Sequence, residues 1–176
     1  MMTEEYALLL FDLDGTLTEY KIGAILPGVR EWFADYSDQP CAIVSNQGGV
    51  GLRHWMESEH FGDPDSYPTE DQVRATIERV IAELKSDMDY NVCFAYCTSK
   101  GKWAPTPDDR ENRVEWQHDW RKPQPGMLLD FINRFGVEVE DVLMVGDWPE
   151  DEDAAAAAGC HFQWAHTFFG RPADTA

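Results

Sequence analysis

Positive charge is scarce in this chain. Its 176 residues include 14 Lys and Arg against 33 Asp and Glu, which gives a formal net charge of −19, and no Lys/Arg-rich run occurs. A surface this acidic repels polyphosphate backbones and anionic membranes. We therefore expect duplex nucleic acid to be disfavoured as a general partner.

Long apolar runs and grouped cysteines are also lacking. No run approaches the roughly 20 apolar residues of a membrane span, and the N-terminus, MMTEEYALLL, is acidic where a signal peptide would be basic. The cysteines are scattered, which fits reduced thiols better than a disulfide frame; they are Cys41, Cys93, Cys97 and Cys160. We expect a soluble, cytoplasmic protein without membrane contact. No feature of the sequence predicts an oligomeric state.

The order of the apolar patterns predicts an α/β fold in one domain, since the length suits a single core. Continuous apolar runs indicate buried strands, and helical spacing of apolar residues indicates amphipathic helices. The expected strands are 6–11, 41–44, 91–96, 141–145 and 160–164, and the expected helices are 29–36, 69–88, 125–135 and 154–158. We predict a parallel sheet of about five strands with helices on both faces.

Two stretches, at about 48–68 and at 97–121, are expected to lack regular secondary structure. Residues 48–51 are rich in glycine, and residues 54–68 are expected to form an irregular acidic loop. A structureless stretch as long as 97–121 is usually functional or disordered, and its three tryptophans argue against disorder. We predict a lid or specificity loop there. Its candidate substrate residues are Trp103, Arg110, Arg113, Trp120 and Arg121.

Two carboxylates, Asp12 and Asp14, follow the first expected strand. In open α/β sheets the ligand crevice lies at the carboxyl ends of the strands, and two acids so close need a shared proton or a cation. Mg²⁺ prefers oxygen ligands and takes only one or two carboxylates. The pair could serve as a nucleophile, as an acid and base, and as ligands of a metal ion. Alternatively, Asp14 and Gly15 could simply form an Asp-Gly turn after the strand.

Polar residues also follow or adjoin the other expected strand ends. Ser45 and the amides near Asn46 can donate hydrogen bonds to an anion, and Lys122 stands just before a Pro-Gln-Pro turn. Asp147 follows the fourth strand and should face the same crevice as Asp12. Asp151 lies four residues on, where an acid also suits the first turn of a helix.

These motifs, in this order, resemble those of the haloacid dehalogenase (HAD) superfamily: DLDGT, a serine at the second strand, a lysine before the third helix, and Gly-Asp-x-x-x-Asp. The SNQ motif with its glycine-rich loop and RKPQPGML are similar to the small-cap branch. That branch includes histidinol-phosphate and heptose-bisphosphate phosphatases and the phosphatase domain of polynucleotide kinase-phosphatases. The resemblance implies a Rossmann-like three-layer sandwich without a large cap. Residues 1–176 would form one phosphatase domain, with insertions at about 48–68 and 97–121 over the active site.

By position, the resemblance implies Mg²⁺-dependent hydrolysis of a small phosphorylated metabolite. Asp12 would be the nucleophile that forms an aspartyl-phosphate, and Asp14 the acid and base. Asp12, the Asp14 carbonyl and Asp147 would bind Mg²⁺. Ser45, Asn46 and Lys122 would hold the phosphoryl oxygens, and Asp151 would orient the metal shell or Lys122.

One departure from the relatives concerns zinc. The heptose-bisphosphate and histidinol-phosphate relatives carry a Cys/His zinc loop before the lysine motif. Here Cys97 and His118 stand at two ligand positions, but Ser99 and Trp120 occupy the partner positions. Two ligands do not close a four-coordinate site, so we predict no zinc.

Three alternatives remain open from the sequence. The chain could be a 3′-phosphatase acting on nucleic-acid ends, or a non-catalytic phosphate-binding or regulatory protein of the same fold. It could also transfer phosphoryl groups between small molecules. The substrate-specific segments contain no motif that names a substrate.

Overall fold

A central sheet of five parallel strands, in the order β3-β2-β1-β4-β5, organises the structure. This computed structural model describes residues 5–85 and 87–173. The strands are β1 (Leu8–Phe11), β2 (Cys41–Asn46), β3 (Asp89–Cys93), β4 (Val142–Gly146) and β5 (His161–Trp164). The predicted α/β class and five-stranded parallel sheet are confirmed.

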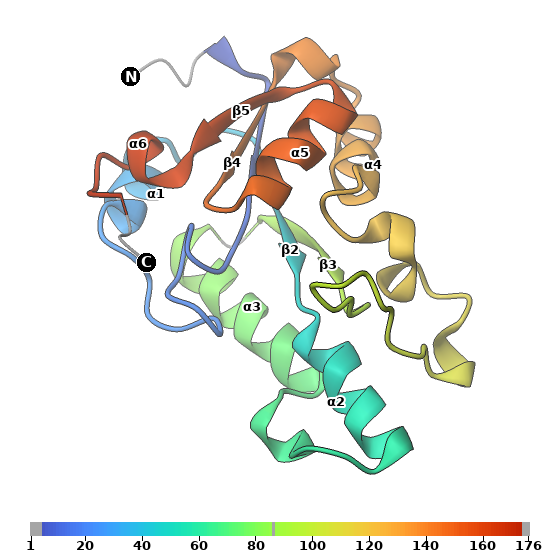
Figure 1. The fold of residues 1–176 in the computed structure, drawn as a ribbon. Coiled ribbons are helices and arrows are strands. Elements are labelled where there is room, and N and C mark those ends of the chain that lie inside the picture. The colour runs from blue at the N-terminus through green and yellow to red at the C-terminus, as the bar shows by residue number, and fades with distance from the viewer. Residues whose placement is uncertain (1–4, 86, 174–176) are drawn as a thin grey trace.

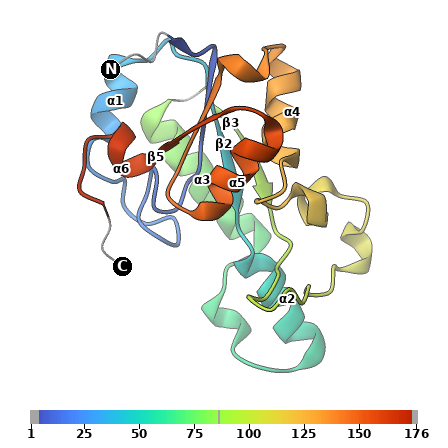
Figure 2. The same ribbon diagram turned by 45° about the horizontal axis from the view of Figure 1, so that its top comes forward.

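Helices cover both faces of the sheet, because successive side chains of a strand point to opposite sides. Leu9 and Phe11 of β1 join a core with helices on one face, and Leu8 and Leu10 join a second core on the other. The first face carries α1 (Val29–Asp35), α3 (Glu70–Leu84) and α6 (Ala165–Phe168), and the second carries α4 (Gly126–Phe135) and α5 (Pro149–Ala158). Figures 1 and 2 show these layers.

The helix ends follow local sequence signals. The Thr69 hydroxyl and the Gln72 side chain form the expected capping box at the start of α3. Gly136 ends α4 with a positive φ of 64°, a backbone conformation that glycine adopts without strain. In 5–85 and 87–173, no helix combines the length and the apolar character needed to cross a membrane.

The expected irregular loop at 54–68 is partly wrong, since Gly49–Glu59 forms helix α2 beyond the carboxyl end of the sheet (Figure 1). The helix buries Val50 and Trp55. A Cβ at Gly51 would lie 2.3 Å from the carbonyl oxygen of Phe94. The glycine therefore permits close packing of α2 against the chain after β3.

The third strand is also displaced from the prediction of 91–96. It spans Asp89–Cys93, because the chain beyond Cys93 leaves the sheet. The Phe94 amide donates to the carbonyl of Glu115 at 2.7 Å, and the carbonyl of Ala95 accepts from the Arg121 side chain. These bonds pair the apolar run with the following insertion.

The insertion at 97–121 is irregular but ordered around buried Trp116. It contains 3-10 helices at Asp108–Arg110, Val114–Trp116 and His118–Trp120. Two of its arginines, Arg110 and Arg113, form ion pairs with Glu70 at the start of α3. These two ion pairs hold the insertion against that helix.

Helix α4 offers a test of the core. Phe131 is fully buried, whereas Leu129 on the same helix is 42% exposed. We expect Phe131→Ala to lower the free energy of unfolding by about 3–5 kcal/mol, since it removes a buried ring and leaves a cavity. Leu129→Ala, the matched control, should change it by less than about 0.5 kcal/mol. Urea denaturation measures both, and equal losses would contradict this assignment of the core.

Candidate active site

The strand order reverses between β1 and β4, and the acids of the site follow these two strands. Such a switch point is where open α/β sheets bind ligands. Asp12 comes directly after β1 and Asp147 directly after β4. Together with Asp151 of α5 they bring three carboxylates together, with one oxygen of each within 4.8 Å of the others.

Lys122 is buried among these acids, with a side chain only 2% exposed. Its Nζ donates to Asp12 Oδ1 at 2.8 Å, to Asp151 Oδ1 at 2.6 Å and to the carbonyl of Val44 at 2.9 Å. An ammonium group has three N–H donors, so all of them are used within the protein. The lysine predicted for phosphate binding thus ties β1, β2 and α5 together.

The side chain of Asn46 fixes the backbone of Lys122. Its Nδ2 donates to the Lys122 carbonyl at 2.9 Å, and its Oδ1 accepts from the Lys122 amide at 3.0 Å. The Asn46 side chain is therefore engaged in this clamp. Ser45 is 1% exposed, and its hydroxyl accepts a hydrogen bond from Gln47 Nε2 at 2.9 Å.

Asp151 anchors the turn between β4 and α5. Its Oδ2 accepts hydrogen bonds at 3.1 Å from the backbone amides of Asp147 and Trp148, and its Oδ1 faces Lys122. With both oxygens occupied, the carboxylate orients the lysine and the turn that carries Asp147.

Asp14 is held apart from the other three carboxylates. Its Oδ1 accepts from the backbone amide of Ile22 at 2.7 Å, and its Oδ2 accepts from Gln47 Nε2 at 3.0 Å. Burial raises the pKa of Asp14, although these two hydrogen bonds act in the opposite direction. A raised pKa suits a carboxyl group that must carry a proton near neutral pH.

The remaining charges are unevenly balanced. Burial and the negative charge of Asp151 raise the pKa of Asp12 well above its usual range, despite the opposing effect of Lys122. Burial also raises the pKa of Asp147. For Lys122, the lowering effect of burial is outweighed by Asp12 and Asp151, which raise its pKa. One cation for three carboxylates leaves negative charge that a bound metal ion would offset.

Asp147 is packed against the chain that follows Asp12. Gly15 has a φ of +78°, and a Cβ there would lie 1.9 Å from Asp147 Oδ2, so only glycine fits. The Tyr20 hydroxyl donates to Asp147 Oδ2 at 2.7 Å, and the Thr16 hydroxyl donates to Oδ1 at 3.4 Å. Arg171 secures this turn by donating to the carbonyls of Gly15 and Thr16.

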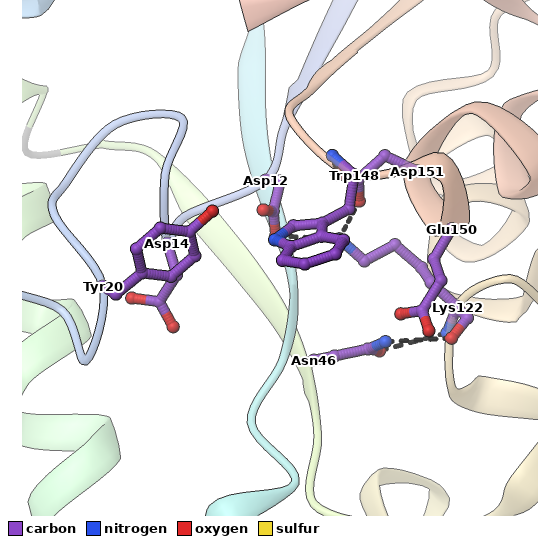
Figure 3. Close-up of a pocket in the computed structure, with 8 residues that line it drawn as sticks. All are labelled: Asp12, Asp14, Tyr20, Asn46, Lys122, Trp148, Glu150 and Asp151. Atoms are coloured by element: carbon purple, nitrogen blue, oxygen red, sulfur yellow. Dashed lines mark hydrogen bonds and ion pairs between the residues drawn. The ribbon is translucent and has the colours of Figure 1, made fainter. Parts of the chain in front are cut away.

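A pocket of about 320 Å³ opens over Asp12, Asp14 and Lys122 (Figure 3). Tyr20 and Asp14 lie on one side, and Lys122 and Glu150 lie on the other. The ring of Trp148 stands at its mouth and is 54% exposed. The full lining is Asp12, Asp14, Tyr20, Asn46, Lys122, Trp148, Glu150 and Asp151.

Among the described residues that line this pocket, none is one of the five candidate residues of the 97–121 insertion. Arg110 and Arg113 bind Glu70, and Trp120 donates its indole N–H to the carbonyl of Val92. Arg121 donates to the carbonyl of Ala95. Trp103 packs with the second core. Their positions are those of residues that fasten the insertion to the domain.

Trp103 also covers one of the two positions considered for zinc. Its ring stacks on the His118 imidazole, with centroids 3.7 Å apart and planes 6° from parallel. Cys97 forms an isolated antiparallel bridge with Trp103 through the backbone. The tryptophan therefore has a structural role where the sequence raised the question of a metal loop.

Sequence reasoning missed several residues that shape the site. Gln47 carries a sequence signal, because it is the last residue of the SNQ motif that also contains Ser45. Tyr20 and Trp148 belong to no motif that would indicate a role in the site. Arg171 contacts a turn 155 residues earlier, so no local pattern could indicate it.

The fold is of the doubly wound α/β class, and the site places three carboxylates and a buried lysine at the switch point of its sheet. The chain belongs to the haloacid dehalogenase-like hydrolases, whose family model matches residues 6–159. The predicted family and enzyme class are thereby confirmed.

Curated relatives carry phosphatase names. The D-glycero-beta-D-manno-heptose-1,7-bisphosphate 7-phosphatase of Photorhabdus laumondii is 28% identical over 166 residues, covering 89% of this chain and 78% of the relative. The enzyme of that name from Neisseria meningitidis serogroup A is 22% identical and covers 86% and 73%. A D,D-heptose 1,7-bisphosphate phosphatase from B. bronchiseptica, solved with magnesium and phosphate, has a TM-score of 0.58 at 24% identity over 88% and 78% of the two chains.

Removing the buried cation should expose the repulsion between the carboxylates. We expect Lys122→Met to lose roughly 3–5 kcal/mol of unfolding free energy at neutral pH, because it leaves buried charges uncompensated. An acid whose folded pKa is raised costs stability above that pKa and regains it as the pH falls through it. The loss should therefore be smaller at about pH 5.5 than at about pH 7.5.

The measurement is urea denaturation at both pH values without divalent cations. Lys100→Met, at an exposed lysine of the insertion, is the control and should change stability by less than about 0.5 kcal/mol at either pH. A loss in Lys122→Met that grows as the pH falls would contradict the assigned charges.

Proposed function

We propose that this protein is a Mg²⁺-dependent phosphomonoester hydrolase that acts on a small phosphorylated metabolite through an aspartyl-phosphate. The observation that carries the proposal is the meeting of Asp12, Asp147 and Asp151 around the buried Lys122, at the switch point of the sheet. Membership of the hydrolase family and the phosphatase names of the relatives support it.

Asp12 is the proposed nucleophile. Its Oδ1 accepts a hydrogen bond from Lys122, which holds the carboxylate in place, and the buried position limits competing water. Attack breaks the bond from phosphorus to the ester oxygen and forms an acyl phosphate on Asp12. Water then attacks that phosphorus and restores the carboxylate, so that one difficult step becomes two easier ones.

Asp14 is the proposed acid and base. It lines the same pocket as Asp12, and its hydrogen bonds with Ile22 and Gln47 hold the carboxyl in place. The protonated group gives its proton to the leaving alkoxide. The resulting carboxylate then takes a proton from the attacking water.

The acids suit the metal that phosphatases of this family use, Mg²⁺. Asp12, Asp147 and the backbone carbonyl of Asp14 offer the hard oxygen ligands that Mg²⁺ prefers. Both oxygens of Asp151 accept hydrogen bonds from Lys122 and two backbone amides. We therefore propose that Asp151 positions Lys122 and the turn that carries Asp147. When bound, the ion supplies positive charge that offsets the charge developing on the phosphoryl oxygens.

The phosphoryl oxygens need donors in addition to the metal. We assign the Ser45 hydroxyl and the backbone amides near Asn46 to this role, because the Asn46 side chain is engaged with Lys122. Lys122 lines the pocket and contributes its charge. A direct hydrogen bond from Lys122 to the phosphoryl group would replace one of its three present contacts.

Loss of the nucleophile should abolish turnover. We expect Asp12→Asn to lower phosphate release by about a thousandfold or more, since residual catalysis would come only from binding and electrostatics. Asp153→Asn, on the exposed side of α5, should keep full activity. The measurement is phosphate release with Mg²⁺ from a panel of sugar phosphates, nucleotides, histidinol phosphate and 3′-phosphorylated oligonucleotides.

The same assay separates the alternatives. Acid quenching with labelled substrate should leave phosphate attached to the wild type and not to Asp12→Asn. Turnover confined to oligonucleotides and weakened steeply by salt would favour a 3′-phosphatase instead. Label recovered on an organic acceptor would indicate phosphoryl transfer, and no turnover of any ester would favour a regulatory protein.

Metal binding should be visible without turnover. At a Mg²⁺ concentration roughly 100 times its Kd, binding stabilises the fold by about 2.7 kcal/mol, which should raise Tm by roughly 5–10 °C in a domain of this size. Asp147→Asn should lose most of that shift. Asp141→Asn, at the opposite end of β4, should retain it. An unchanged shift in Asp147→Asn would remove Asp147 from the metal site.

A further inference from the structure

A second, larger pocket adjoins the catalytic one. Its volume is about 570 Å³, within the usual range for small-molecule sites. It shares Asp14, Tyr20 and Asn46 with the catalytic pocket and is bounded by the start of α2, the 64–68 segment and the first turns of α3. A group leaving from a phosphoryl bound near Asp12 would pass Asp14 and enter this space.

The walls combine an apolar surface with neutral hydrogen-bonding groups. The apolar part includes Ile22, Tyr67, Pro68 and Val73, and the neutral polar part includes Gln47, Ser66, Gln72 and Thr76. Flat apolar and aromatic surface beside amides and hydroxyls suits a compound with both C–H faces and many hydroxyl groups. A ring or chain bearing hydroxyls meets both requirements.

Gln47 supplies a fixed acceptor at the junction of the two pockets. It is 8% exposed and lines the larger pocket. Its Nε2 donates to Asp14 Oδ2 and Ser45 Oγ, which sets the orientation of the amide. Because Gln47 lines the larger pocket, its Oε1 can accept a hydrogen bond from a substrate hydroxyl there.

The larger pocket offers little positive charge for a second phosphate. Its lining carries the carboxylate of Asp65 and, among the described residues, a single cation, Lys21. Arg53 lies behind the wall, where it donates to the carbonyls of Pro64 and Tyr67 and pairs with Asp65. Its guanidinium is thus used to brace the 64–68 segment.

From these features we infer that the substrate is the monophosphate of an uncharged polyhydroxy compound, whose hydroxyl-bearing part occupies this pocket. The inference rests on the proposed phosphatase function. It differs from a transfer of the relatives' substrate, because the heptose bisphosphates in their names carry a second phosphate.

Two matched substrates test the charge argument. We expect kcat/KM for glucose 6-phosphate to exceed that for glucose 1,6-bisphosphate by about tenfold or more, since the pocket offers a second phosphate few cationic partners and places the Asp65 carboxylate beside it. Asp65→Lys should narrow this ratio by raising the value for the bisphosphate. A wild-type preference for the bisphosphate, or a ratio unmoved by Asp65→Lys, would overturn the inference.

A second variant tests the location. Thr76→Trp should fill the pocket and remove the contacts between its wall and the sugar. We expect kcat/KM for glucose 6-phosphate to fall about tenfold relative to that for acetyl phosphate, which corresponds to about 1.4 kcal/mol. The acetyl group is too small to reach the pocket. Ala75→Trp, at the neighbouring exposed position on α3, is the control and should leave the ratio unchanged.

The outcomes distinguish the two levels of the proposal. Hydrolysis of acetyl phosphate with no dependence of the sugar ester on residue 76 would refute the pocket and leave the phosphatase assignment standing. No hydrolysis of any ester by the Mg²⁺-loaded protein would refute the phosphatase assignment, and the inference with it.

Discussion

The buried ammonium of Lys122 is the contact on which the site depends. Carboxylates that meet in a low-dielectric interior repel one another, and a shared cation or a proton relieves that repulsion. Lys122 contacts one acid from β1 and one from α5, and a carbonyl of β2 completes its three bonds. Asn46 fixes the lysine from its backbone, so the cation cannot drift from the acids it joins.

The charge balance suggests an order of events. Lys122 offsets one of the three clustered carboxylates, and a divalent cation would offset the other two. A phosphate dianion would then enter a nearly neutral site, where backbone and hydroxyl donors can hold it. Asp14 stands apart from the cluster and has a pKa that burial raises.

The sequence predicts the strand ends well, because an apolar run that stops at an acid marks both a buried strand and its tip. This pattern predicts Asp12 and Asp147, whereas Lys122 is predicted from its place before the Pro-Gln-Pro turn, and the structure brings the three residues together. Their proposed roles in metal and phosphate binding remain predictions. Helix α2 was missed because its glycines suggested flexibility, whereas Gly51 is there to allow close contact with the chain after β3.

Contacts between distant segments could not be read from the sequence. Tyr20 donates a hydrogen bond to Asp147, which lies 127 positions further along the chain. No local sequence pattern around either residue indicates this contact. The contacts of Arg110 and Arg113 in the 97–121 insertion could not be read from the sequence either. A cationic residue near a phosphate site suggests substrate binding, but Glu70 of α3 takes up Arg110 and Arg113.

The fastening of that insertion has a consequence for specificity. Glu70 also accepts from Arg74 of its own helix, so three guanidinium groups converge on one carboxylate and burial of Trp116 adds apolar contact. In a segment held this way, Arg110 and Arg113 are engaged before a ligand arrives. Under the inference drawn above, discrimination between substrates would then depend on the wall formed by α2, the 64–68 segment and α3.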